Sequence, residues 1–165
     1  HYINHFLLKI DPEGQPIVIK ELLEVFHERW KNVDRKTAEI AYQNYNFVNK
    51  TILLHGNDIN VQSLIDLLLV NHKKFNVIQL ISHQDKFGKE QAAILASKGV
   101  DVKVIDDAGV GKFLPEIDVV LLGCEIIMHE TFIVKTGAHI IAAAANFYKI
   151  PVYVLADSRK LLNKK

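Results

Sequence analysis

From residue 51 onward the sequence alternates short apolar runs with segments of helical periodicity, a pattern that few folds accommodate. The apolar runs lie at residues 51–55, 76–81, 102–105, 118–122 and 152–155. Short strands that alternate with helices predict βαβ units, and βαβ units build a parallel sheet. The nearly continuous apolar character of residues 119–122 also favours strands that helices cover on both faces. We therefore expect an α/β fold with a mostly parallel sheet and flanking helices.

The residues before the first apolar run have the periodicity of an amphipathic helix. Their apolar side chains recur at steps of three and four, at Ile19, Leu22, Leu23, Phe26, Trp30 and Val33. This spacing predicts a helix over about residues 17–47. Two interpretations stay open at residues 32–34, either a continuous helix or a break with Asp34 as the N-cap of a second helix. We expect Trp30, Phe26 and Leu23 to need a covering surface, from a second chain or from the sheet.

Two segments depart from the alternation. Residues 124–135 are too short for a helix and a strand, so we expect a small hairpin or an irregular excursion there. Residues 159–165 are basic and are expected to form a frayed tail. The chain then divides into a helical segment over residues 1–48 and an α/β domain over residues 49–165. Because His1 stands where a start methionine would be, we expect the chain to be a fragment.

The charge balance and the cysteine count exclude several classes of function. The 165 residues include 20 Lys and Arg against 19 Asp and Glu, a net charge of +1. This balance provides no electrostatic footprint for duplex nucleic acid or an anionic membrane. The one cysteine, Cys124, excludes a disulfide framework and suits a reducing compartment. No apolar run approaches the ~20 residues that span a bilayer, so we expect a cytoplasmic protein with no nucleic-acid or membrane partner.

Polar residues follow each predicted strand, at the edge where an open α/β sheet binds its ligands. In addition, Lys135 and Gly137 stand just before an alanine-rich helix. A helix N-terminus offers unpaired N–H donors to an anion, and a nearby lysine adds positive charge. We therefore predict a phosphate pocket that also uses backbone N–H groups after the first strand. The predicted ligand-binding residues are His55, Gly56, Asn57, Ser82, Lys135, Gly137 and Lys160.

Each of these features also has a purely structural interpretation. Asn57, Asp58 and Ser82 are residue types that cap helices. Asp106 is either half of a catalytic pair with Asp107 or a cap beside a surface charge. Cys124 is expected to be a small buried residue rather than a nucleophile. The eight histidines show no ligand spacing and no GxGxxG fingerprint occurs, so we expect neither a metal nor a cofactor.

Several stretches, in this order and spacing, resemble a known protein family. They are Thr-Ile-Leu-Leu-His-Gly-Asn at 51–57, Val-Ile-Asp-Asp-Ala at 104–108, Val-Leu-Leu-Gly-Cys-Glu at 120–125, Val-Lys-Thr-Gly at 134–137 and Pro-Val-Tyr-Val-Leu-Ala-Asp-Ser-Arg-Lys at 151–160. The chain resembles the C-terminal part of the family that comprises three branches. These are the alpha, beta and delta subunits of eukaryotic translation initiation factor 2B, methylthioribose-1-phosphate isomerase and ribose-1,5-bisphosphate isomerase.

The resemblance implies a Rossmann-like domain that dimerises and binds a phosphorylated sugar or nucleotide at the strand ends. Residues 1–48 would then be the remnant of the family's N-terminal helical domain. In the isomerase branches an Asp and a Cys transfer the protons. The Cys position here is Gly56 and the Asp position is Glu125. Glu125 is also what the non-catalytic alpha subunits tend to carry, so the resemblance favours the regulatory branch.

Three hypotheses follow. The first is a regulatory protein that binds a phosphorylated sugar or nucleotide without turnover and forms a homodimer or pairs with homologous subunits. The second is an isomerase of aldose phosphates, with Glu125 as acid and base and with Asp106 or His55 in place of the missing Cys. Loss of one such group costs a proton-transfer catalyst ~10²–10⁴-fold in rate. The third is a scaffold whose pocket is vestigial.

Overall fold

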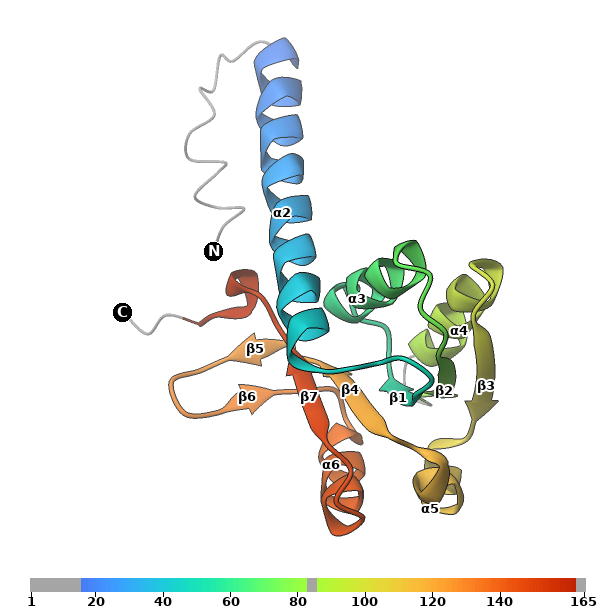
Figure 1. The fold of residues 1–165 in the computed structure, drawn as a ribbon. Helices are drawn as coiled ribbons and strands as arrows, with labels where there is room; N and C mark the ends of the chain where they lie inside the picture. The colour runs from blue at the N-terminus through green and yellow to red at the C-terminus, as the bar shows by residue number, and fades with distance from the viewer. Residues whose placement is uncertain (1–15, 83–85, 163–165) are drawn as a thin grey trace.

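A single parallel sheet organises the part of the chain that the computed structural model describes, residues 16–82 and 86–162 (Figure 1). Its spatial order is β3-β2-β1-β4-β7, and every neighbouring pair of strands is parallel. The Rossmann-like α/β class expected from the sequence is confirmed, because each predicted strand is present. The strands are β1 (Thr51–His55), β2 (Asn76–Leu80), β3 (Asp101–Ile105), β4 (Val119–Gly123) and β7 (Val152–Leu155).

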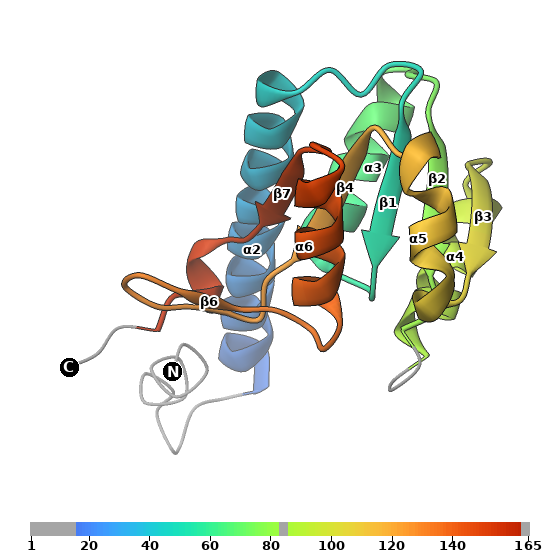
Figure 2. The same cartoon turned by 90° about the horizontal axis from the view of Figure 1, so that it is seen from below.

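Helices cover both faces of the sheet (Figure 2). One face carries α2 (Pro16–Asn44), α3 (Ile59–Val70) and α4 (Phe87–Ser97), and the other carries α5 (Val110–Phe113) and α6 (Ala138–Phe147). Successive side chains of a strand point to opposite faces. Accordingly Ile52 and Leu54 belong to the first hydrophobic cluster, whereas Leu53 belongs to the second. A strand buried on both faces needs apolar residues at every position, which explains the unbroken apolar runs.

Helix α2 is continuous, so of the two interpretations left open at residues 32–34 the unbroken helix is the one that the structure has. Asp34 lies inside the helix and pairs with Arg159 instead of acting as an N-cap. Packing of α2 along α3 outweighs the weak helix propensity of asparagine and aspartate. Trp30 is buried within this chain, at 7% exposure, so its cover comes from the same chain and needs no second one. Leu23 remains 50% exposed, as that expectation required.

The segment between β4 and α6 forms a small antiparallel hairpin, one of the two alternatives that the sequence left open. Its strands are β5 (Ile126–Ile127) and β6 (Phe132–Ile133). In both views the hairpin projects to one side of the sheet, beside the chain that follows β7 (Figures 1 and 2).

The predicted frayed tail is wrong where the structure describes it. The 3₁₀ turn η3 (Ser158–Lys160) follows β7, and its side chains make several ion pairs. Beyond this turn, the Leu162 N–H donates to the Ile127 carbonyl at 2.8 Å and ties the chain to the hairpin. Residues 163–165 lie outside the described residues. Specific partners, which the basic composition of the segment did not reveal, order its first half.

The N-terminal end of α4 approaches the end of β2 too closely for any side chain. A Cβ placed on Gly88 would lie 1.9 Å from the Leu80 carbonyl oxygen and 2.7 Å from that of Ile81. These neighbours are backbone atoms of a buried strand, so they cannot move aside without disturbing the sheet. Gly88 therefore permits the close packing of α4 on β2.

We expect Gly88→Ala to destabilise the protein by about 1–3 kcal/mol, because the added methyl group forces α4 away from the strand. Denaturant unfolding measures this loss. Gly111→Ala is the matched control, since a Cβ there meets nothing within 4 Å and alanine favours a helix by up to about 1 kcal/mol. Equal stability of the two variants would contradict the proposed role of Gly88.

Candidate functional site

The strand order places a topological switch point between β1 and β4. From β1 the chain continues toward β2, on one side, whereas from β4 it continues toward β7, on the other. The loops that leave two such strands diverge and open a crevice at their carboxyl ends, where open α/β sheets bind ligands. Residues 55–58 and 123–125 lie at this place in the chain.

Four of the predicted ligand-binding residues meet at the end of β1, and we call them the strand-end cluster: His55, Gly56, Lys135 and Gly137. A Cβ placed on Gly56 would lie 2.6 Å from Lys135 Cδ, and one on Gly137 would lie 3.4 Å from His55 Nε2. The lysine stem therefore crosses directly over Gly56, and its Nζ lies 4.4 Å from the centre of the Phe87 ring. Gly137 has a φ of +94° and precedes the first residue of α6, as predicted.

Ser82 holds the backbone of the cluster rather than capping a helix. Its Oγ accepts a hydrogen bond from the Gly56 N–H at 2.8 Å, and its own N–H donates to Asp107 Oδ1 at 3.0 Å. The N–H of Asp58 likewise donates to Gln91 Oε1 at 3.2 Å. The N–H groups of Gly56 and Asp58 are thus engaged within the protein, so the predicted ligand contact of the backbone after β1 would fall to other groups.

Two buried amide side chains that sequence reasoning missed support this turn. Gln79 donates to the Gly56 carbonyl at 3.1 Å and accepts from Gln91 Nε2 at 2.9 Å. Gln79 and Gln91 are 0% and 1% exposed, and a buried polar group is retained only where it is hydrogen-bonded. The detectable signal was a glutamine within the apolar run at 76–81.

An ion pair lies at the switch point itself. Asp58 Oδ2 accepts from Lys160 Nζ at 2.6 Å, while Oδ1 caps α3 by accepting from the N–H groups of Asn60 and Val61. A Cβ placed on Gly123 would lie 2.4 Å from Asp58 Cγ, so only glycine at the end of β4 leaves room for this carboxylate. The capping interpretation is confirmed for Asp58, and Lys160 lies where a ligand-binding residue was predicted.

The other predicted site residues lie outside the strand-end cluster. Asn57 is half-buried, and its Oδ1 accepts from Gln62 Nε2 at 2.5 Å. Glu125 is exposed where the chain leaves β4, and Asp106 is exposed after β3, where it caps the N–H of Ala108. Because β2 and β1 separate β3 from β4, and strands lie about 4.8 Å apart, this placement favours His55 over Asp106 as a partner of Glu125.

Cys124 is buried at 1% exposure, as expected. Its Sγ lies 3.3 Å from the Ile126 carbonyl oxygen and 3.5 Å from that of Ile133, at the base of the hairpin. Burial raises the pKa of this thiol above its ordinary value, against the opposing effect of Lys160. A protonated, buried thiol is a packing residue and a poor nucleophile.

Beside the switch point, Arg159 joins two carboxylates. It donates to Asp157 from its backbone N–H and from Nε, both at 2.8 Å to Oδ1, and its guanidinium also pairs with Asp34 of α2. Asn60 Nδ2 donates to Asp157 Oδ2 at 2.9 Å. Although burial alone raises the pKa of Asp157, the hydrogen bonds from Arg159 and Asn60 outweigh it and hold the pKa at about 2. The sequence analysis missed this arginine's role.

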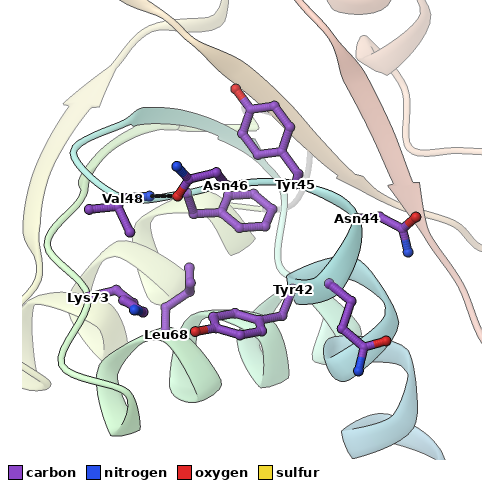
Figure 3. A pocket seen from close by; sticks show the side chains of 9 residues that line it. Tyr42, Asn44, Tyr45, Asn46, Val48, Leu68 and Lys73 are labelled. Carbon is purple, nitrogen blue, oxygen red and sulfur yellow. Dashed lines mark hydrogen bonds between the residues drawn. The ribbon is translucent and has the colours of Figure 1, made fainter.

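Two hollows on the surface lie near the amino ends of the strands, and Figure 3 shows the first of them. One, of about 290 Å³, is lined by Tyr42, Phe47 and Leu68, where the chain enters β1. A second, of about 450 Å³, is lined by residues that precede β1, β2 and β3, among them Asn49 and Asn76. Both are remote from the strand-end cluster, because the strands are parallel and these residues lie at their amino ends.

Across residues 16–82 and 86–162, no helix is both long and apolar enough to cross a membrane. Within the same ranges no group of three or more His, Cys, Asp or Glu side chains is arranged to hold a metal ion.

Proteins similar to this chain in sequence include initiation-factor subunits and an isomerase. The chain is 38% identical over 111 residues to translation initiation factor eIF2B subunit alpha of Dictyostelium discoideum, covering 67% of this chain and 35% of the relative. It is 30% identical over 166 residues to ribose 1,5-bisphosphate isomerase of Archaeoglobus fulgidus, covering 99% of this chain and 52% of that protein. The chain therefore spans about half or less of these relatives' length.

Solved structures agree with this relationship. The Pyrococcus horikoshii translation initiation factor eIF-2B superposes with a TM-score of 0.81 at 26% identity, over 94% of this chain and 57% of that one. A subunit of the tetrameric eIF2B-beta2-delta2 complex from C. thermophilum superposes with a TM-score of 0.76 at 25% identity, over 98% of this chain and 54% of that one. The model of the initiation factor 2 subunit family matches residues 11–165. Sequence and fold together therefore make this chain a member of the initiation factor 2 subunit family.

Proposed function

We propose that this chain is a regulatory, initiation-factor-2B-like protein that binds a phosphorylated sugar or nucleotide and works in the cytoplasm with a second copy or a homologous subunit. The observation that carries the ligand proposal is the strand-end cluster. Lys135 crosses Gly56 directly before the N-terminus of α6, and Lys160 lies at the adjoining switch point. Ammonium groups beside a helix N-terminus are suited to an anion such as phosphate.

The residues at the two positions that are catalytic in the isomerase branches support binding over turnover. Gly56 has no side chain to transfer a proton, and its φ of +73° together with the overlying Lys135 stem excludes a larger residue there. Glu125 is exposed. A proton-transfer catalyst needs its groups held within hydrogen-bond reach of the reacting carbon. The cluster offers cations for binding, but no built pair of acid and base.

An isomerase is the second candidate, because ribose 1,5-bisphosphate isomerase of Archaeoglobus fulgidus aligns with 99% of this chain. In that case Glu125 would transfer the proton, and His55, buried at 6% exposure at the end of β1, would take the place of the missing cysteine. His55 lies beside Gly137 and so belongs to the strand-end cluster.

Exposed apolar side chains support the pairing with another subunit. Ile140 and Phe147 of α6 are 74% and 83% exposed, and Phe132 of the hairpin is 53% exposed. Ile140 and Phe147 are seven residues apart and so share one face of α6, and exposed apolar side chains on one face mark a site of protein association. The C. thermophilum neighbour is itself a complex of two kinds of homologous subunit. A like subunit is the partner that we propose for this surface.

We expect a phosphorylated sugar or a nucleotide to raise the temperature of thermal unfolding. A ligand at about one hundred times its dissociation constant adds ~2.7 kcal/mol, which is several degrees for a chain of this length. The measurement is thermal unfolding with methylthioribose 1-phosphate, ribose 1,5-bisphosphate, hexose phosphates and AMP. Lys135→Met should remove most of the shift.

Lys103→Met is the control for Lys135→Met. Lys103 Nζ also lies over a phenylalanine ring, 4.2 Å from the centre of Phe113, but it extends from the edge strand β3. It should leave the ligand shift intact. If none of these compounds raises the unfolding temperature, or if unphosphorylated sugars raise it equally, the proposed ligand class is contradicted.

Glu125→Gln separates binding from catalysis. If the chain only binds, this variant should keep the thermal shift, and neither protein should convert an aldose phosphate to its ketose. If the chain is an isomerase, turnover should be measurable in the wild type and fall ~10²–10⁴-fold in the variant. A coupled assay of ketose formation on the compound that gives the largest shift decides between them.

We expect the wild type to have the mass of a dimer by light scattering after size-exclusion chromatography, and Ile140→Glu to shift it toward the monomer. A buried carboxylate without a partner is strongly unfavourable in an interface. Val70→Glu is the matched control, because Val70 of α3 is also 74% exposed. A monomeric wild type would contradict the proposed association.

A further inference from the structure

Two consecutive side chains of the turn η3 form ion pairs, one with the switch point and the other with α2. Lys160 Nζ lies 2.6 Å from Asp58 Oδ2 at the switch point. The guanidinium of Arg159 pairs with Asp34 in the middle of α2. The two cationic side chains extend from consecutive residues of η3, so a displacement of one residue also displaces its neighbour.

Arg159 holds the middle of α2 through two residues that lie one helical turn apart. Besides its pair with Asp34, its Cζ lies 5.2 Å from the centre of the Trp30 ring, within the range of a cation–π contact. Residues four apart in a helix share a face, so Trp30 and Asp34 together form the surface that receives the guanidinium. Trp30 is the one tryptophan of the chain.

The residue before η3, Asp157, is hydrogen-bonded to the first helical turn of α3. Asp157, whose side chain is 0% exposed, accepts from Asn60, and Asn60 is only two residues from Asp58. The Lys160 N–H donates to the Asp157 carbonyl at 3.1 Å. Lys160 is therefore held by Asp58 at the start of α3, and Arg159 is held by Asp157, which Asn60 of the same helix end binds.

Three carboxylates share two cations in this group. Asp34, Asp58 and Asp157 face Arg159 and Lys160, and the charges of Asp157 and Asp58 both act on Asp34. If Lys160 leaves Asp58 for another anion, Asp58 is no longer neutralised and attracts Arg159. That attraction competes with Asp34 and Trp30 for the guanidinium, because opposite charges in a partly buried site interact strongly.

We propose that η3 couples the ligand site to α2, so that an anion which draws Lys160 from Asp58 loosens the hold of Arg159 on Trp30 and Asp34. The identity of the anion rests on the proposed function, whereas the link from Lys160 to Trp30 does not. Binding of an anion at the switch point would thereby control how firmly α2 is held on the α/β domain.

Acrylamide quenching of the Trp30 fluorescence tests the link without any ligand. Lys160→Met should increase the quenching constant, by at least half of the increase that Arg159→Met produces, whereas the double variant Lys160→Met/Asp58→Asn, which has no unpaired carboxylate to attract Arg159, should not increase it. Asp58→Asn keeps a good N-cap on α3 and removes only the charge that holds Lys160. The denaturation midpoint of the double variant confirms that it is folded.

Lys98→Met is the matched control, because Lys98 forms the same kind of pair with Asp66 at 2.5 Å, between α4 and α3. It should leave the quenching constant unchanged. If Lys160→Met, shown to be folded by its denaturation midpoint, also leaves it unchanged, or if the double variant increases it as much as Lys160→Met does, the coupling is wrong.

The second arm adds AMP and ribose 1,5-bisphosphate to the wild type. Either compound should increase quenching at the concentration where it raises the unfolding temperature. A thermal shift without a change in quenching overturns the coupling but leaves the proposed function standing. Increased quenching in Lys160→Met but not in the double variant, with no response to either compound, supports the link through η3 and contradicts the proposed ligand.

Discussion

The structure depends on the central strand β1, which is buried on both faces and pairs in parallel register with β2 and β4. Leu53 pairs with Ile78 on one side and with Val120 on the other. Burial of apolar side chains on both faces leaves this strand a single register, since a slip by one residue would exchange every side chain between the faces. The end of β1 is thereby placed between two other strand ends, and residues 55–58 follow from it.

Two glycines leave the space in which Asp58 and Lys135 approach the end of β1. Gly123 leaves the space that Asp58 fills, and Gly56 leaves the space that the Lys135 stem crosses. Gln79 and Ser82 then bind the Gly56 peptide from both sides, so the turn is rigid before any ligand arrives. Preorganised cations bind an anion with little loss of conformational freedom. Such an edge suits recognition of a phosphorylated molecule.

Members of this fold differ in function because function resides in a few residues at the strand ends. The relatives of this chain include an initiation-factor subunit and a sugar-phosphate isomerase. What distinguishes this chain is Gly56 and Glu125 at the two positions that carry catalysis in the isomerases, in an edge that keeps its lysines. The shared fold is the basis of the proposed ligand class, and the substitutions are the basis of the proposed loss of turnover.

The sequence alone determined the strands, the helices and the helix start after Gly137, because periodicity and glycine signals are local. It also brought His55, Lys135 and Lys160 to one edge, because parallel strands end on the same side. The tertiary structure decided the rest. Arg159 pairs with Asp34, 125 residues away, and this contact orders the start of a tail that was predicted to be frayed. Charge–charge and amide pairs across such distances have no periodicity, so they appear only when the fold brings their partners together.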